Sequence, residues 1–200
     1  MGVNGFITLL FWLLVAVIVG VDHARKLATE EQRTRQLALS AEELGFEFLP
    51  QVEIEALYAS NLDLFTQDYG KRIFNVMKAR VENWEIRLFD YEYFWPGNKI
   101  TFRQSVMCLD LPEICQPIFQ QGYSEKVIQK LFVRELRKLG KNQPCVIIEL
   151  SKNYFVCYRR NVRVAPNDML TFVNEGLDAF ALSLEVINTL QRIFFSDKVA

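Results

Sequence analysis

A run of apolar residues near the N-terminus is the strongest pattern in the chain. Residues 1–21 contain no charged side chain, and Phe6 to Val21 read FITLLFWLLVAVIVGV. A helix from Val3 to Val21 would be about 28 Å long at about 1.5 Å per residue, close to the ~30 Å hydrocarbon core of a bilayer. The pattern predicts a transmembrane helix over residues 1–21, a juxtamembrane helix over 22–44 and an α+β soluble domain over 45–200.

A cleaved signal peptide is the main alternative for this run. Such a peptide has a basic N-terminal region and small residues at its cleavage site. The first five residues contain neither Lys nor Arg, and Val19 and Val21 are poorly suited to cleavage. A lipid anchor on Gly2 is not expected either, because Phe6 occupies the position where the myristoylation pattern requires Ser or Thr. We therefore expect a retained membrane anchor.

Positive charge follows the apolar run at Arg25, Lys26, Arg33 and Arg35. Because Lys and Arg are enriched on the cytoplasmic side of a membrane span, this bias predicts a cytoplasmic domain. The expected topology is a single pass through a membrane.

The four cysteines bear on the same question of compartment. Cys108, Cys115, Cys145 and Cys157 show no CxxC spacing. In a reducing compartment they are expected to be free, mostly buried thiols. The opposite topology would permit two disulfides.

Alternating β-branched and aromatic residues predict sheet in the middle of the chain. A short strand is expected at Phe46–Leu49, and an antiparallel meander over residues 72–81, 84–95 and 100–109. In the second strand of the meander, Phe89, Tyr91, Tyr93 and Trp95 share one face. This aromatic face could belong to the core, or it could stack bases or line a ligand pocket.

The last third of the chain predicts a helix, a β-hairpin and a long closing helix. The helix is expected over residues 124–140, between a Ser N-cap and a terminal Gly. The hairpin strands are expected over 146–150 and 154–159, and the closing helix over 166–194. Strands and helices in this order predict an α+β domain.

Composition and motifs offer little sign of catalysis. The net charge is −1, so no nucleic-acid partner is expected. No GxGxxG, P-loop, GxSxG or HExxH motif occurs, and His23 is the single histidine. We expect no catalytic residue, no cofactor and no metal site. Asp90 and Glu92 could act as an acid–base pair, or they could pair with Arg87 and Arg103.

Two helical surfaces are candidates for binding. The helix over residues 124–140 and the loop after it carry a basic face that is simply solvated, or directed at anionic lipid or an acidic partner. Its residues are Lys126, Lys130, Arg134, Arg137, Lys138 and Lys141. The closing helix is apolar on two sides, so it either lies in the core or also docks a partner protein. Its candidate docking residues are Phe180, Leu182, Leu184, Val186 and Ile187.

Three segments together suggest a family. They are RIFNVMK at residues 72–78, LFDYEY at 88–93 and FRQSV at 102–106. This pattern resembles uncharacterised single-pass bacterial membrane proteins, in which an N-terminal anchor precedes an α+β domain containing NV…FDYxY…QxV. The resemblance supports the anchored-domain interpretation and implies a location in the bacterial inner (plasma) membrane. It implies no activity.

Three functional hypotheses remain open from the sequence. The first is a membrane-anchored, non-enzymatic interaction protein, an accessory or scaffold component of a membrane complex. The second is a lipid- or ligand-sensing module at a membrane surface, using the basic helix and the aromatic sheet face. The third is an enzyme that uses Asp90 and Glu92.

Overall fold

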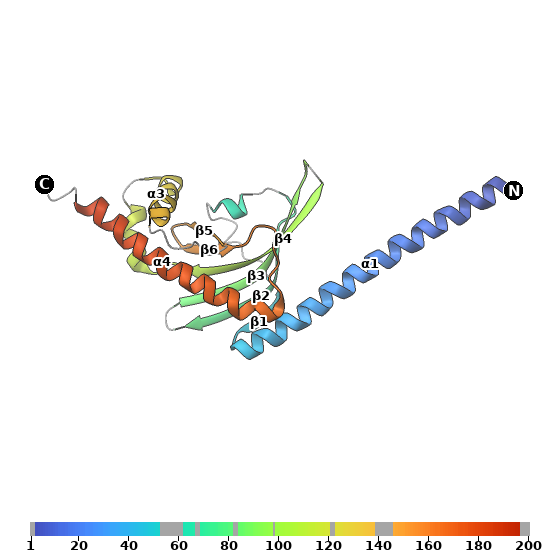
Figure 1. The fold of residues 1–200 in the computed structure, drawn as a ribbon, viewed down its shortest axis with the longest axis horizontal. Helices are drawn as coiled ribbons and strands as arrows, with labels where there is room; N and C mark the ends of the chain where they lie inside the picture. The colour runs from blue at the N-terminus through green and yellow to red at the C-terminus, as the bar shows by residue number, and fades with distance from the viewer. Residues whose placement is uncertain are drawn as a thin grey trace.

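An antiparallel sheet with helices on one face forms the body of the molecule, and a long N-terminal helix projects from it (Figure 1). This computed structural model describes residues 3–52, 62–66, 69–81, 84–97, 99–120, 123–138 and 146–196. Its helices are α1 (Val3–Leu44), α3 (Glu125–Lys138) and α4 (Met169–Ser196), with short 3-10 turns η1 (Asp63–Phe65), η2 (Glu113–Gln120) and η3 (Pro166–Asp168). Its strands are β1 (Glu47–Gln51), β2 (Arg72–Val81), β3 (Trp84–Trp95), β4 (Ile100–Asp110), β5 (Ile147–Leu150) and β6 (Tyr154–Tyr158).

The six described strands form one sheet in the order β1-β2-β3-β4-β6-β5, with every neighbouring pair antiparallel. The α+β class, the meander, the helix, the hairpin and the closing helix predicted from the sequence are confirmed, with boundaries that differ by a few residues. Pro166 begins η3 and leads directly into α4, as its fixed backbone φ favours at the start of a helix.

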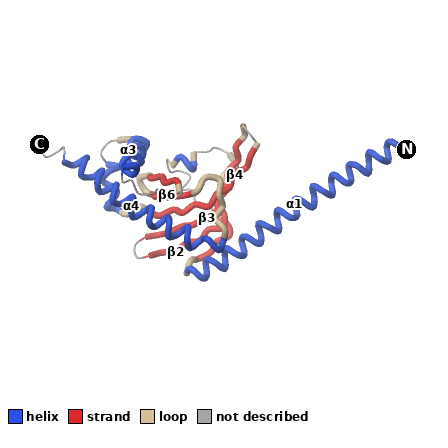
Figure 2. Tube along the Cα trace, viewed as in Figure 1, coloured by secondary structure: helices blue, strands red, loops and turns tan. Residues whose placement is uncertain are grey.

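The two faces of the sheet pack against different partners. One face carries Leu88, Met107 and Phe155, which are buried under α4, α3, η2 and the C-terminal end of α1. Figure 2 shows α4 crossing this face of the strands. The other face carries Phe89 and Val106, which pack against the segment around η1. The alternation of side chains along each strand produces this division.

A β-bulge interrupts the pairing of β2 with β3. Phe74 pairs with Asp90 and Met77 pairs with Leu88, so two residues of β2 stand opposite one residue of β3. The bulge is centred on Asn75, whose φ of 53° lies in the left-handed region that Asn tolerates better than most residues. As a result, the side chain of Asn75 turns toward α1 and Asp90.

The transmembrane helix predicted over residues 1–21 is wrong. In the part of the chain that the structure describes, no helix combines the length and the apolar character needed to cross a membrane. The prediction treated the apolar run as an element of its own. In the structure that run is the outer part of one continuous 42-residue helix, which goes on through the charged residues Asp22, Arg25 and Lys26.

Candidate functional site

The end of α1 near the sheet is attached through a buried polar cluster centred on Asp90 of β3. The Asp90 side chain is 1% exposed, and its two carboxylate oxygens accept five hydrogen bonds. Arg33 of α1 donates two of them, each 2.9 Å long. Asn75, Ser105 and Arg163 donate the others, at 3.0, 2.9 and 3.2 Å. Asp90 therefore connects α1 with β2, β4 and the segment after β6.

A second carboxylate, Glu30 of α1, extends the cluster. Arg163 donates two hydrogen bonds to Glu30, at 2.8 and 2.7 Å, and Arg103 donates a third at 2.6 Å. Arg103 also pairs with Glu92 of β3, which is 9% exposed. Because two adjacent arginines each contact two acidic side chains, the ion pairs form a continuous network. This network fixes where α1 leaves the domain.

The charges of the cluster determine the ionisation of its central carboxyl. Burial alone would raise the pKa of Asp90, but the hydrogen bonds and charge of Arg33, together with Arg163 and Asn75, hold that pKa below its ordinary value. The pKa of Glu30 is also lowered, chiefly by its hydrogen bonds from Arg163. Both side chains are therefore carboxylates at neutral pH.

The cluster decides how Asp90 and Glu92 are used in this fold. Both side chains lie on the α1 side of the sheet, and both are engaged by arginines. Glu92 pairs with Arg103, as one of the sequence interpretations expected. Arg87 does not pair with Asp90; it contacts Glu85 and Asp110 instead. Both carboxylates thus form ion pairs that hold parts of the fold together.

The basic face of α3 lies on the surface. Lys126, Lys130, Arg134 and Arg137 are exposed, and Arg134 pairs with the neighbouring Glu135. The backbone of Lys138 is part of α3, whereas Lys141 lies outside the described residues. Binding of this face to anionic lipid stays a prediction.

The candidate docking residues of α4 lie largely inside the domain. Phe180, Val186 and Ile187 are 3%, 1% and 1% exposed. Leu182 and Leu184 are half-buried against the same core. Core packing therefore accounts for Phe180, Val186 and Ile187, because side chains this deeply buried have no area left for a partner. Docking of a partner on Leu182 and Leu184 stays a prediction.

The cysteines within the described ranges are free thiols. Cys108, Cys115 and Cys157 are buried and unbridged, as expected, while Cys145 lies outside those ranges. Burial raises the pKa of Cys108 to about 12 and that of Cys115 to about 11. These thiols are therefore unreactive at neutral pH, since the thiolate is the nucleophile.

The aromatic row of β3 is divided between the core and a cavity. Phe89 and Tyr91 are buried, and Tyr91 packs edge-on against Phe65 with ring centroids 5.2 Å apart. Farther along the strand, Tyr93 is half-buried and Trp95 is 43% exposed. The sequence allowed either a core face or a pocket lining, and the structure contains both.

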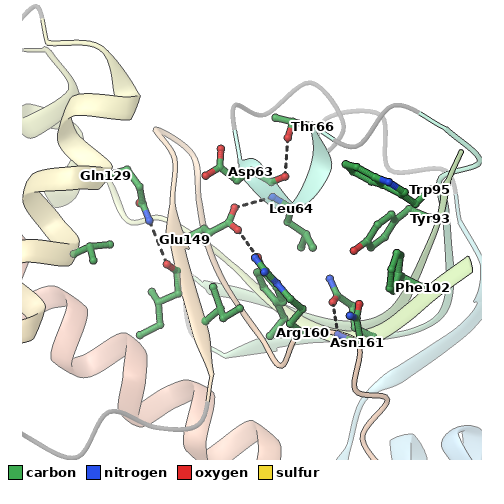
Figure 3. Close-up of a pocket in the computed structure, with 15 residues that line it drawn as sticks. Asp63, Leu64, Thr66, Tyr93, Trp95, Phe102, Gln129, Glu149, Arg160 and Asn161 are labelled. Atoms are coloured by element: carbon green, nitrogen blue, oxygen red, sulfur yellow. Dashed lines mark hydrogen bonds between the residues drawn. The ribbon is translucent and has the colours of Figure 1, made fainter. Parts of the chain in front are cut away.

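The cavity has a volume of about 790 Å³ and opens on the sheet face away from α4. Tyr93, Trp95 and Phe102 line one side, with Asn161 beside Phe102, and Glu149 and Arg160 lie across from them (Figure 3). These residues come from β3, β4, β5 and the segment after β6. Segments distant in the sequence therefore meet here.

Glu149 is a buried carboxyl of this cavity that the sequence analysis did not single out. It is 6% exposed and accepts hydrogen bonds from the Tyr158 hydroxyl at 2.5 Å and from the backbone N–H of Leu64 at 3.0 Å. Burial raises its pKa, and the two hydrogen bonds only partly oppose that effect. The sequence did contain a signal for this site, because Glu149 is an acidic residue within the otherwise apolar strand Ile147–Leu150.

Within the described ranges, no three His, Cys, Asp or Glu side chains are placed to hold a metal ion together. Comparison of the chain with protein families, with curated proteins and with solved structures finds no match, so the family resemblance rests on the quoted sequence motifs alone.

Proposed function

We propose that this chain is a non-enzymatic interaction protein in which α1 holds the sheet domain beside an apolar α-helix of a partner protein. One observation carries the proposal. The outer part of α1 exposes a continuous set of large apolar side chains, among them Leu13, Ile18 and Val19 at 57%, 59% and 63%. Exposed apolar area of this extent is unfavourable in water and typically marks an interaction surface.

A stripe of small residues indicates what kind of partner fits. Ala16, Gly20, Ala24 and Ala28 recur every four residues and are all exposed, so they lie along one side of α1. A Cβ placed on Gly20 would meet no atom within 4 Å. Small residues in this spacing let two helix backbones approach closely. We therefore propose that an apolar helix of another protein packs against this stripe.

The cluster around Asp90 supports the same role. It uses the pair Asp90 and Glu92 to fix α1 on the sheet. At about 1.5 Å per residue, the 42-residue helix is about 63 Å long. A helix of this length, held on the sheet near its C-terminal end, presents its outer part well away from the domain (Figure 1).

Photo-crosslinking at native expression level tests the proposal. A photoreactive residue at Val17 is expected to give a discrete protein adduct, and mass spectrometry should place the linked peptide in an apolar helix. The same residue at Arg35, whose side chain is 81% exposed on the charged part of α1, should give none. Gly20→Leu should abolish the adduct because it fills the stripe. Ile18→Leu, on the other side of the helix, should not.

Three results would contradict the proposal. They are adducts with lipid only, adducts with a second copy of the same chain, or equal yields for Gly20→Leu and Ile18→Leu. Adducts with lipid only would indicate that the outer part of α1 binds a lipid surface and not a partner protein. Adducts with a second copy of the chain would indicate that α1 mediates self-association.

A second candidate function is binding of anionic lipid headgroups through α3, favoured by the exposure of its basic face. Each basic residue near such a surface contributes about 1 kcal/mol. Changing Lys130, Arg134 and Arg137 together to Gln should then reduce the preference for vesicles containing phosphatidylserine over neutral ones. Arg72→Gln with Arg192→Gln, two exposed arginines elsewhere, serves as the control. An unchanged preference would exclude this candidate.

A further inference from the structure

The cavity over the end of β3 combines two unlike walls. Tyr93 and Phe102 stack with ring centroids 5.2 Å apart, and Trp95 continues this aromatic wall toward the surface. Arg160 stands across the cavity from it, and Asn161 lies beside Phe102 (Figure 3). The volume of about 790 Å³ falls within the roughly 300–1,000 Å³ typical of small-molecule sites. An amphipathic ligand of one or two rings would fit between these walls.

Arg160 is the cation of the cavity that is available to a ligand. Its neighbour Arg159 turns away and pairs with Glu175 of α4. Arg160 is exposed, and within the described part of the chain it forms no ion pair with an acidic side chain. Its positive charge opposes the burial that raises the pKa of Tyr93.

The acidic groups of the cavity are already engaged or stand at its edge. Both carboxyl oxygens of Glu149 accept hydrogen bonds from the protein itself, from Tyr158 and Leu64. Asp63 lies toward α3, where it also lines a neighbouring smaller pocket. Neither acidic side chain forms an ion pair with Arg160 among the described residues, so its guanidinium can donate hydrogen bonds to a ligand.

We propose that this cavity binds a small planar aromatic anion, with its ring against Tyr93, Trp95 and Phe102 and its carboxylate or phosphate on Arg160. A guanidinium binds either acid group through charge-assisted hydrogen bonds. The aromatic wall supplies apolar area and favourable ring contacts. The site is separate from α1, so it adds a ligand to a protein whose proposed partner docks elsewhere.

Calorimetric titration of the full chain in mild detergent tests this site. The probes are indole-3-carboxylate and phenyl phosphate, with neutral indole and acetate for comparison. One of the two aromatic acids, or both, should bind one-to-one, and each comparison compound should bind at least about tenfold more weakly. The better acid identifies the anionic group that the site prefers.

Two variants assign the binding to the cavity. Arg160→Gln and Trp95→Ala should each weaken binding of the better acid by about tenfold. Arg192→Gln, which removes an exposed arginine of α4, should leave it unchanged. Both altered side chains of the cavity are at least partly exposed, so an unchanged urea midpoint will show that each variant is folded.

The inference is overturned if neither aromatic acid binds at millimolar concentration. It is also overturned if acetate binds as well as the aromatic acids, or if Arg160→Gln binds like Arg192→Gln. None of these outcomes depends on α1, so they leave the crosslinking test of the partner helix unaffected.

Discussion

Replacing Asp90 with Asn should destabilise the protein strongly, because it removes the carboxylate charge that pairs with Arg33. The side chains of Arg33 and Arg163 are only 13% and 17% exposed. Removing one partner of a buried ion pair costs about 3–5 kcal/mol, since the other charge is left without compensation. Arg163 retains Glu30, and Arg33 retains the Val164 carbonyl at 2.8 Å. We therefore expect a loss of about 3 kcal/mol, at the lower end of that range.

Urea unfolding, followed by tryptophan fluorescence in mild detergent, measures this loss. Asp110→Asn is the matched control, because Asp110 also pairs with an arginine but its side chain is 43% exposed. Arg87 would keep its contact with Glu85, so the control should lose about 1 kcal/mol or less. Hydrogen exchange of the α1 backbone near Arg33 should accelerate in Asp90→Asn alone. A loss for Asp90→Asn no larger than that for Asp110→Asn would refute the assignment of Asp90 as the central group of the cluster.

Gly176→Ala should lower the free energy of unfolding by about 1–3 kcal/mol, because its Cβ would lie 2.2 Å from the Met107 sulfur in a filled core. Urea midpoints measure this, and a shorter side chain in Met107→Val should recover part of the loss. Asn75→Ala should cost about 1 kcal/mol more than Asn75→Gly, because Ala is strained at the φ of 53°. Equal urea midpoints would contradict that reasoning. The contribution of Asp90 is present above its ordinary pKa of 3.8 and is lost as the pH falls through its lower folded value. Melting temperatures measured from about pH 6 to about pH 2 should therefore fall in the wild type, and less in Asp90→Asn.

The sheet was predictable because its pattern is local. Alternating β-branched and aromatic residues gave the positions of β2, β3 and β4, and the same alternation placed Phe89 and Tyr91 on one face. The basic residues of α3 were placed on its exposed side for a similar reason, since helical spacing separates Lys130 and Arg134 from Phe132. Such periodicities follow from backbone geometry alone.

The apolar helices were harder to interpret, because apolarity does not say what covers a helix. The run near the N-terminus predicted a transmembrane helix, and the structure shows it as the outer part of the longer α1. The apolar stripes of α4 suggested a partner, yet Phe180 and Ile187 lie in the core. Only the three-dimensional packing shows that this chain itself covers the sheet face where α4 lies.

The sequence by itself determined the order of helices and strands, the side of each strand that is apolar, and the charged face of α3. The tertiary structure alone decided which distant residues meet. Glu30, Asp90 and Arg163 are spread over more than half of the chain, and their pairing depends on sheet register and on where α1 docks. Arg160 and Trp95 likewise face one cavity only because β4 and β6 are neighbours. Local periodicity reflects the geometry of a single helix or strand, whereas these contacts depend on how separate elements pack.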